Sequence, residues 1–402
     1  MQILFVSTHL PIPPNIGQSI RSLSIIQALV SLGHQVSFVS FAGRGRGQDL
    51  RPLSTLCTSI NLLDREMKNL TLEKNYLMRI ACLLRLKSYS IERFRSVAMR
   101  DRIQDELQRG KYDLIICDSI YSLINIPDTT IPQLLNCHNV EYVILRRYAR
   151  VETNPLKKCY ALAESNLMRD AERNGLAQID GVMACSKDDL EILRTLCPAC
   201  SVFVVPNVVD TISIQPCEPE GRHGGDRTLL FQGVMDWYPN RDAVQYFART
   251  IFPRIRAECP DVRFVVAGRN PPLNFVEEFR SERKIEFTGT VPDMRPYLEA
   301  ADVVVVPLRI GGGTRLKILE ACAAGRPVVS TTIGAEGLDL RAGKEIIVVD
   351  DPSEFARGVV ALLRNPVQRS LLSNHARSAV VERYSFSTLE KTIGSVISTF
   401  NT

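Results

Sequence analysis

The sequence predicts an α/β fold made of two doubly wound, Rossmann-like domains. Short apolar runs alternate with longer amphipathic runs, a pattern typical of parallel sheets built from βαβ units. This alternation occurs twice along the chain, which indicates two such sheets. The length agrees, because 402 residues, 45% of them hydrophobic, are too many for a single core and suit two domains.

The first half of the chain contains six strand-like runs with helix-like segments between them. Each run is a few residues long and rich in Ile, Leu, Val or Phe, as strands buried on both faces are. The predicted strands are 3–7, 35–41, 112–118, 132–137, 181–186 and 201–206, and the predicted helices are 19–32, 74–109, 141–177 and 187–196.

The second half repeats this order. Its predicted strands are 228–233, 262–268, 285–289, 302–308, 327–331 and 345–350, and its predicted helices are 240–258, 293–300, 314–324, 352–364 and 366–382. A final helix is predicted within 383–402, and we expect it to cross back onto the first domain.

A polar segment at 207–227 separates the halves. It is rich in Gly and Pro and has no hydrophobic periodicity, as expected for a linker. The predicted first domain is 1–210 together with the cross-over helix 383–402, and the predicted second domain is 211–382. Polar, Gly-rich loops follow several strands in both halves. Ligands of such sheets bind at the carboxyl ends of the strands, so the two rows of loops would face one another across an interdomain cleft.

The stretch "RIGGGTRLKILEACAAGRPVVS" (309–330) carries the strongest site signal. A glycine loop opens a helix whose start holds Arg315 and Lys317, although a helix N-terminus is already positive. Backbone N–H groups, an Arg and a Lys together suit phosphate, and Glu320 is placed to accept hydrogen bonds from vicinal hydroxyls. The set fits a nucleoside diphosphate. The alternative is a tight loop with solvated cations and a Lys317–Glu320 helix pair.

Two further loops are candidate sites in the first half. Gly17 opens a helix after the first strand and predicts a second anion or sugar site, or else an ordinary strand-to-helix turn. His138 follows a strand on the expected ligand side, where an imidazole can donate to a substrate oxygen or handle a proton. The alternative for His138 is a capping or packing role.

The segment 74–102 is basic and amphipathic. It holds two acids, Glu92 and Asp101, and eight cations between apolar residues. Such helices can lie on an anionic membrane surface, and the alternative is a solvated helical face packed on its own domain. The cations are Lys74, Arg79, Arg85, Lys87, Arg93, Arg95, Arg100 and Arg102.

The composition limits the functional classes. The net charge is only +5 and no nucleic-acid-binding motif is present, so no nucleic acid partner is expected. Eleven cysteines without a framework indicate a reduced compartment, and the single Cys197–Cys200 pair is either incidental or redox-active. No cluster of metal-ligand spacing is found, so no metal or other cofactor is expected. Without an apolar run long enough to span a bilayer, we expect a cytoplasmic protein, with peripheral contact at the inner face of the membrane left open.

Several of these loops resemble one family. "P-x-x-G-x-x-x-R" at 14–21, "CHNVEY" at 137–142, "VVPNVVD" at 204–210 and "KILEACAAGRPVVST" at 317–331 are similar to motifs of glycosyltransferase family 4, whose members have the GT-B fold. The resemblance implies a metal-independent, retaining transferase of the hexosyltransferase type. It would use a nucleotide sugar in the second domain and a glycan or lipid-linked acceptor in the first, for bacterial cell-surface polysaccharide synthesis.

The resemblance also implies residue roles. Arg315 and Lys317 would stabilise the departing diphosphate, and His138 would contact the donor sugar or the acceptor oxygen, so these three are the expected catalytic residues. Glu320 would bind the ribose, and Gly17 would let the first-domain loop approach the phosphates. The expected donor-binding residues are Gly17, Gly233, Asn240, Gly268, Arg269, Val291, Gly312, Gly313, Thr314 and Glu320.

The chain departs from the family pattern in two places. The family commonly carries two Glu residues, of which Glu320 is the second; Gly312 stands eight residues before it, near the place of the first Glu, which usually contacts the donor sugar. The family usually has a pair of basic residues after the first strand of the donor domain. In this chain only Arg241, beside Asn240, is basic in that region, so we infer that Arg315 and Lys317 take over the role of the pair. The form "GGGTRLKILEA" resembles a sub-group of polysaccharide-biosynthesis sugar transferases. A sugar-nucleotide epimerase of the same fold, and a non-catalytic nucleotide-sugar-binding subunit of a membrane complex, are the alternative functions.

Overall fold

The computed structural model describes residues 1–42, 49–64, 72–216 and 227–400. The chain forms two compact units. Unit 1 is Met1–Pro206 with Leu389–Thr402, and unit 2 is Asn207–Thr388. The sequence-based boundaries were 210/211 and 382/383. Two segments lie outside the described residues. One is most of the second half of the predicted linker 207–227, and the other is the short sequence "GRGRG" at 43–47.

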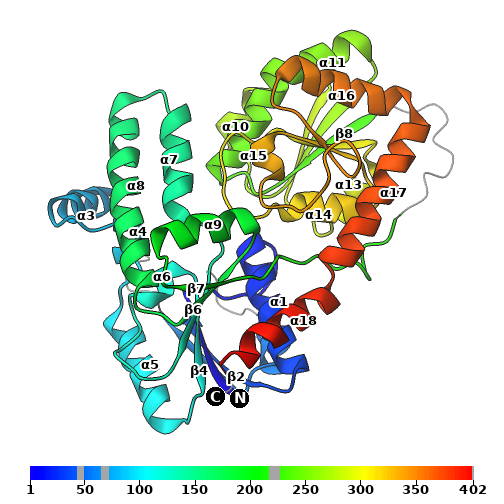
Figure 1. Ribbon diagram of the computed structural model, residues 1–402. Helices are drawn as coiled ribbons and strands as arrows, with labels where there is room; N and C mark the ends of the chain where they lie inside the picture. The colour runs from blue at the N-terminus through cyan, green and yellow to red at the C-terminus, as the bar shows by residue number, and fades with distance from the viewer. Residues whose placement is uncertain (43–48, 65–71, 217–226, 401–402) are drawn as a thin grey trace. The chain divides into compact units, whose positions relative to one another are not determined.

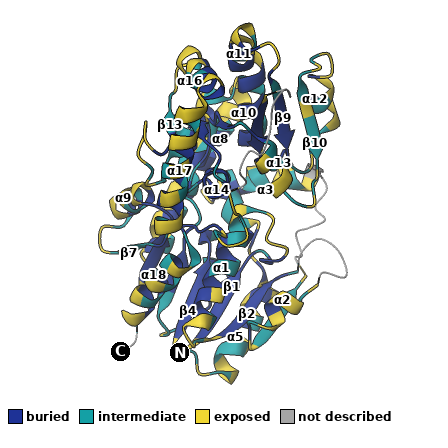
Figure 2. Ribbon diagram, turned by 90° about the vertical axis from the view of Figure 1, so that its right-hand side faces the viewer, coloured by how far each residue is buried: buried dark blue, intermediate teal, exposed yellow. Residues whose placement is uncertain are grey.

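Unit 1 is built on a seven-stranded sheet in the order β3-β2-β1-β4-β5-β6-β7, with every pairing parallel. The central strands are buried along almost their whole length, because helices cover both faces (Figure 2). The strands are β1 (Gln2–Ser7), β2 (Gln35–Phe41), β3 (Ser59–Leu63), β4 (Leu114–Asp118), β5 (Gln133–Asn136), β6 (Gly181–Ala184) and β7 (Ser201–Val204).

Along the chain, the helices of unit 1 alternate with these strands, and in space they flank the sheet (Figure 1). They are α1 (Gly17–Ser31), α2 (Arg51–Ser54), α3 (Leu72–Leu84), α4 (Tyr89–Glu92), α5 (Val97–Arg109), α6 (Ile120–Leu123), α7 (Glu141–Val151), α8 (Pro155–Leu176) and α9 (Lys187–Leu196). The last helix, α18 (Phe386–Ser398), begins in unit 2 and ends in unit 1.

Two long predicted helices are wrong as single elements. The predicted helix 74–109 is α3, α4 and α5, because Leu86 turns into the left-handed region and Ser96 starts a new helix by accepting from Met99 N. The predicted helix 141–177 is α7 and α8, because the Asn154 side chain caps α8 and Pro155 occupies its first turn. The strand β3 was missed, since its sequence SINLL is half-buried and mixes polar with apolar residues.

Unit 2 has a six-stranded parallel sheet in the order β10-β9-β8-β11-β12-β13. A cluster of aromatic rings forms part of its core, with the ring centroids of Phe247 and Phe264 only 4.6 Å apart. The strands are β8 (Thr228–Gln232), β9 (Arg263–Ala267), β10 (Ile285–Gly289), β11 (Val303–Val306), β12 (Val328–Ser330) and β13 (Ile347–Val348).

The five helices predicted in unit 2 are all present, whereas the short helices α12 and α15 were not predicted. The predicted helix 240–258 is continuous but carries a π-helical turn, η2 (Phe247–Ile251), in its middle. The others are α10 (Tyr238–Tyr246), α11 (Phe252–Glu258), α12 (Leu273–Glu277), α13 (Arg295–Ala300), α14 (Leu316–Ala323), α15 (Thr332–Ala335), α16 (Pro352–Arg364) and α17 (Pro366–Arg383). No helix within the described ranges is long and apolar enough to cross a membrane.

Each sheet has one point at which the strand order reverses. In unit 1 this point lies between β1 and β4, and in unit 2 it lies between β8 and β11. The chain leaves neighbouring strands in opposite directions there, which opens a crevice at their carboxyl ends, the usual ligand position of doubly wound sheets. Ligand-binding residues are therefore expected at these two reversal points.

Candidate functional site

The glycine loop after β11 is shaped around the side chain of Arg315. This guanidinium is buried and donates hydrogen bonds from Nη1 to the carbonyls of Gly312 and Gly313, and from Nη2 to Ile333 O at 3.1 Å. Gly311 has φ +155°, and a Cβ atom there would lie 2.4 Å from Arg315 Nη2, so a larger residue would strain the loop and displace this guanidinium. Arg315 therefore holds the loop in shape, and its direct contact with a diphosphate stays a prediction.

Lys317 lies in the first turn of α14, which no side chain caps. Its Nζ donates to Asn240 Oδ1 at 2.8 Å and lies 4.2 Å from the centroid of the Phe231 ring. Burial, together with the positive charge of Arg315, lowers the pKa of Lys317 to about 7. Among the described residues its ammonium forms no ion pair. Two cations thus lie close together at a helix N-terminus, where an anion would relieve their repulsion.

Two glycines bring the loops after β8 and β9 into contact with this helix. A Cβ on Gly233 would lie 2.8 Å from Asn240 Nδ2 and 3.0 Å from Lys317 Nζ, and a Cβ on Gly268 would lie 1.8 Å from Gly233 O. Asn240 is fixed from its other end, because Nδ2 donates to Val234 O at 2.8 Å. The reversal point of unit 2 is therefore a tightly fitted polar site.

Glu320 lies one turn beyond Lys317, and its carboxylate accepts a hydrogen bond from Gln232 Nε2 at 2.5 Å. Burial raises the pKa of Glu320 to about 7, against the opposing effects of Lys317 and Gln232. Sequence reasoning missed Gln232, although a polar residue ending the apolar run 228–233 was a usable signal. Its Oε1 atom is buried and has no hydrogen-bond partner in the described parts of the chain, so the site can accept a further donor.

The remaining predicted donor residues lie at the carboxyl ends of the same sheet. Arg269 follows Gly268, and its Nε is buried without a hydrogen-bond partner among the residues described. Thr314 Oγ1 accepts from Asn207 Nδ2 at 2.5 Å. Val291 lies beyond β10, an edge strand two places from β8.

In unit 1 the reversal point holds Asp118, which sequence reasoning missed. This buried carboxylate, the last residue of β4, accepts four hydrogen bonds. The donors are Ser7 Oγ at 2.7 Å, Ser22 Oγ at 2.8 Å, Asn136 Nδ2 at 2.7 Å and His138 Nε2 at 2.8 Å. Burial alone would raise the pKa of Asp118, but His138 and the two hydroxyls outweigh it and lower the pKa.

Asp118 fixes the orientation of the predicted catalytic His138. In the neutral form, an imidazole that donates from Nε2 to a carboxylate has Nδ1 as its acceptor. A base held by a third group is the arrangement that proton transfer needs. The signal for Asp118 in the sequence was its place as the one acid at the end of the predicted strand 112–118.

Gly17 is the first residue of α1, whose N-cap Ile16 offers no side-chain hydrogen bond. Arg21, one turn later, is buried and donates from Nε to Asn136 Oδ1 at 2.8 Å and from Nη1 to Val205 O at 2.7 Å. Asn136 also donates to Asp118, so α1 is anchored to the His138 site. A contact between Gly17 and phosphate stays a prediction.

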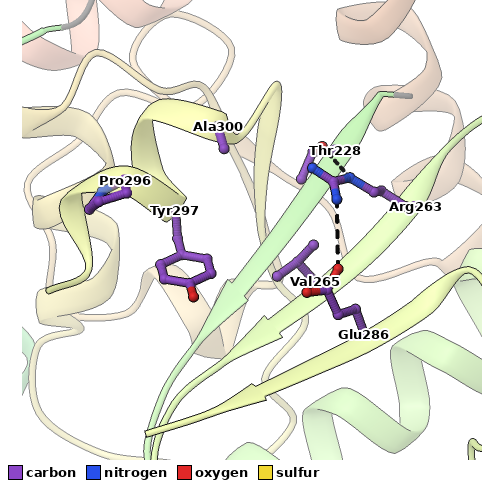
Figure 3. Close-up of a pocket in the computed structure, with 7 residues that line it drawn as sticks. All are labelled: Thr228, Arg263, Val265, Glu286, Pro296, Tyr297 and Ala300. Carbon is purple, nitrogen blue, oxygen red and sulfur yellow. Dashed lines mark hydrogen bonds and ion pairs between the residues drawn. The ribbon is translucent and has the colours of Figure 1, made fainter. Parts of the chain in front are cut away.

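A small cavity of about 150 Å³ in unit 2 lies apart from these residues (Figure 3). Thr228 and Arg263, the first residues of β8 and β9, line it, so it lies at the edge of the sheet opposite Gly233 and Gly268. Arg263 is bonded there to Thr228 and paired with Glu286 at 3.6 Å. Within the described ranges, no group of three or more His, Cys, Asp or Glu side chains is placed to hold a metal ion.

Sequence comparisons match both halves of the chain. The model of "Glycosyltransferase Family 4" matches residues 17–212, and that of "Glycosyl transferases group 1" matches residues 226–365. An uncharacterized 44.6 kDa protein in the cps region of Klebsiella pneumoniae is 23% identical over 95% of this chain and 96% of its own length. The phosphatidyl-myo-inositol mannosyltransferase of Mycobacterium tuberculosis is 29% identical over 48% of this chain and 53% of that protein.

Solved structures agree on the fold. Sucrose-phosphate synthase from Thermosynechococcus elongatus superimposes with a TM-score of 0.74 at 16% identity, covering 99% of this chain and 98% of that one. Anabaena HepE, solved in complex with UDP and glucose, gives a TM-score of 0.66 at 14% identity, covering 99% of each chain. With both halves matched and both sheets wound in this order, the chain is a family 4-like glycosyltransferase of the GT-B fold.

Proposed function

We propose that the protein transfers a hexosyl group from a nucleotide-diphosphate sugar to a glycan or lipid-linked acceptor, with retention of configuration, during bacterial cell-surface polysaccharide synthesis. Unit 2 would bind the nucleotide sugar and unit 1 the acceptor. The Klebsiella relative lies in a cps region, and the HepE structure holds UDP and glucose, which supports a polysaccharide role and a nucleotide-sugar donor.

The observation that carries this proposal is the state of Lys317. Its ammonium lies beside a second cation at a helix N-terminus, and its pKa falls to about 7. Such a site stabilises positive charge poorly until an anion enters, and then stabilises that anion strongly. A sugar transfer develops its largest negative charge on the departing diphosphate, so preorganised cations there act on the transition state. We propose that Lys317 and the N–H groups of the α14 first turn supply this charge, without a metal ion.

We propose that Glu320 accepts hydrogen bonds from the ribose hydroxyls and that Gln232 orients it. The raised pKa of Glu320 fits, because a buried carboxylate gains from neutral hydroxyl donors. His138, oriented by Asp118, would contact the donor sugar or the acceptor oxygen, while the departing phosphate helps to deprotonate the acceptor.

A thermal-shift panel of UDP-, GDP- and dTDP-sugars tests the donor. A ligand that binds only the native state raises its melting temperature, so at least one member should do so at millimolar concentration. If none does, the donor proposal fails. Product analysis with the donor so identified then separates the alternatives. Transfer to a glycan acceptor supports the proposal, whereas an epimerised nucleotide sugar, or binding with no turnover, supports one of the two alternatives.

A further inference from the structure

Helix α3 presents an exposed apolar surface that the transfer reaction does not use. Leu77, Ile80 and Leu84 are spaced i, i+3 and i+7, so they form one stripe along the helix. We define the α3 apolar face as this stripe with Tyr76 and Leu86, whose exposed fractions are 64% for Tyr76, 66% for Leu77, 54% for Ile80, 81% for Leu84 and 80% for Leu86. Contiguous exposure of large apolar side chains marks an interaction site.

The opposite side of α3 is fixed against unit 1. Cys82 is buried there, and the Asn75 side chain accepts a hydrogen bond from Tyr89 Oη at 2.9 Å. The Arg79 guanidinium lies 5.0 Å from the ring centroid of Tyr89 and 5.4 Å from that of Tyr160, which places it between the two rings. These contacts fix the orientation of α3 about its own axis, so its apolar face points away from unit 1.

Both the backbone conformation and the solvent exposure of Leu86 are energetically unfavourable. It closes the C-terminus of α3, with Leu86 N bonded to Leu83 O at 3.1 Å and Lys87 N bonded to Cys82 O at 2.9 Å. This is the Schellman pattern, in which the left-handed residue is usually glycine, but here a leucine adopts φ 53°. The same side chain is almost fully exposed. Leu86 thus combines a strained backbone with an exposed apolar side chain, which points to a contact between Leu86 and a binding partner.

The charges around this face are positive. Arg85 and Lys87 are exposed on either side of Leu86, and no acid occurs in the sequence from Lys74 to Ile91. Lys87 forms an ion pair with Glu92 at 3.6 Å, and its side chain stays about half exposed. This surface is narrower than the predicted basic segment 74–102. Beyond α3, Arg95 pairs with Glu92 at 2.8 Å and Arg102 pairs with Glu106 at 4.0 Å, while Arg79 is held between two rings.

We propose that the α3 apolar face inserts into the interface of an anionic lipid bilayer, with Leu84 and Leu86 in the acyl boundary and Arg85 and Lys87 at the phosphates. A row of apolar side chains flanked by cations is what such a surface binds. Five side chains are far fewer than the roughly 20–30 residues per partner of a stable protein interface. The inference rests on the proposed function only in that a bilayer would present a lipid-linked acceptor.

The position of α3 within unit 1 agrees with this role. α3 contacts α8 through Arg79 and Tyr160 and projects sideways from it, α8 pairs with α7, and α7 begins three residues after His138 (Figure 1). α7 and α8 extend beyond the carboxyl ends of the unit 1 strands, the same edge as the His138 site. An enzyme held at a bilayer through α3 would therefore hold that edge near the lipid.

Flotation of the full-length protein with vesicles tests the inference. The protein should float with phosphatidylcholine–phosphatidylglycerol vesicles at low salt, and much less with pure phosphatidylcholine. The variant Leu77→Gln/Ile80→Gln/Leu84→Gln should bind at least about tenfold more weakly. Arg85→Gln/Lys87→Gln should lose on the order of tenfold on anionic vesicles. The controls Leu273→Gln, an exposed leucine of unit 2, and Lys111→Gln/Arg283→Gln, the same charge change elsewhere, should bind as the parent does.

The variant Leu86→Gly separates a membrane role from a structural one. Glycine removes the backbone strain, so the melting temperature should rise while vesicle binding falls; unchanged binding would count against the inference. The inference is overturned if the parent fails to float, or if the apolar variant only abolishes self-association in light scattering. Thermal shift with nucleotide sugars is measured on every variant, so a protein that binds its donor but not vesicles fails this inference alone.

Discussion

The two reversal points differ in how their charges are satisfied. In unit 1, Asp118 accepts four hydrogen bonds and its pKa is lowered, so this site is electrostatically complete without a ligand. In unit 2, the pKa values of both Lys317 and Glu320 move towards 7, the direction that neutralises each group. The first site holds one side chain in place, and the shifted pKa values of the second agree with the proposal that an anion binds there.

The largest effect is expected when the charge of Lys317 is removed from the unit 2 site, which we call the incomplete site. Lys317→Met should lower the rate of sugar transfer by about 10²- to 10³-fold, because one preorganised donor to the developing charge is lost. Steady-state kinetics with the donor found by thermal shift measures this, and Lys344→Met, an exposed lysine of the same unit, is the control. Wild-type rates for Lys317→Met would remove this residue from the diphosphate site.

The complete site should respond differently. Asp118→Asn keeps the shape of the side chain but removes the charge that holds His138 Nε2, so transfer should fall by about 10²-fold, the usual contribution of a positioned acid or base. Donor binding in the thermal shift should stay unchanged, and so it should in His138→Ala. Asp128→Asn, an exposed aspartate of unit 1, is the control. Equal losses of donor affinity and of turnover would show that the comparison between the two sites is wrong.

The sequence predicted the sheets well because buried parallel strands are short apolar runs. The run 35–41 matches β2 and the run 285–289 matches β10 at both ends. It predicted helix breaks poorly, since nothing in "LLRLKS" shows that Leu86 adopts the left-handed conformation where glycine is usual. Strand β3 was missed because an edge strand need not be apolar.

The candidate sites show a similar division. Residues that follow strands, such as His138 and Lys317, could be predicted because their place in the chain implies the carboxyl edge of a sheet. Their partners Asp118 and Gln232 end strands of other βαβ units, and only the fold shows that Asp118 accepts from His138 and that Gln232 donates to Lys317 O. The loop-holding contacts of Arg315 were also hidden, because a cation in a glycine loop looks the same whether it faces a ligand or carbonyls.

A smaller effect is expected at Arg315, whose hydrogen bonds to three carbonyls hold the glycine loop in shape. Both Arg315→Ala and Arg315→Lys should weaken donor binding by about tenfold, since a lysine cannot reach three carbonyls from one point charge. Titration calorimetry with the identified nucleotide sugar measures the loss, and Arg283→Ala is the control. If lysine restores binding and alanine does not, charge on the phosphate is the role of Arg315 and the loop contacts are secondary.

The smallest effect expected is a pH dependence near neutrality, which the Lys317–Glu320 site should show and the Asp118 site should not, because the lowered pKa of Asp118 acts only in the acidic range. The folded pKa of Lys317, about 7, lies below its ordinary 10.5, so the unfolded chain binds more protons and stability rises with pH between these values. The folded pKa of Glu320, about 7, lies above its ordinary 4.5, so stability falls as pH rises between 4.5 and 7. Together the two groups make the ligand-free protein least stable near pH 7.

A diphosphate beside Lys317 would raise its pKa, so binding the donor above pH 7 should take up a proton. Affinity should then fall as pH rises, by at most about tenfold for each pH unit. Calorimetry in buffers of different ionisation enthalpy counts this proton directly. Lys317→Met should abolish the uptake and Asp118→Asn should leave it intact. A proton taken up by both variants would place the titrating group elsewhere, and the contrast between a complete and an incomplete site would lose its electrostatic basis.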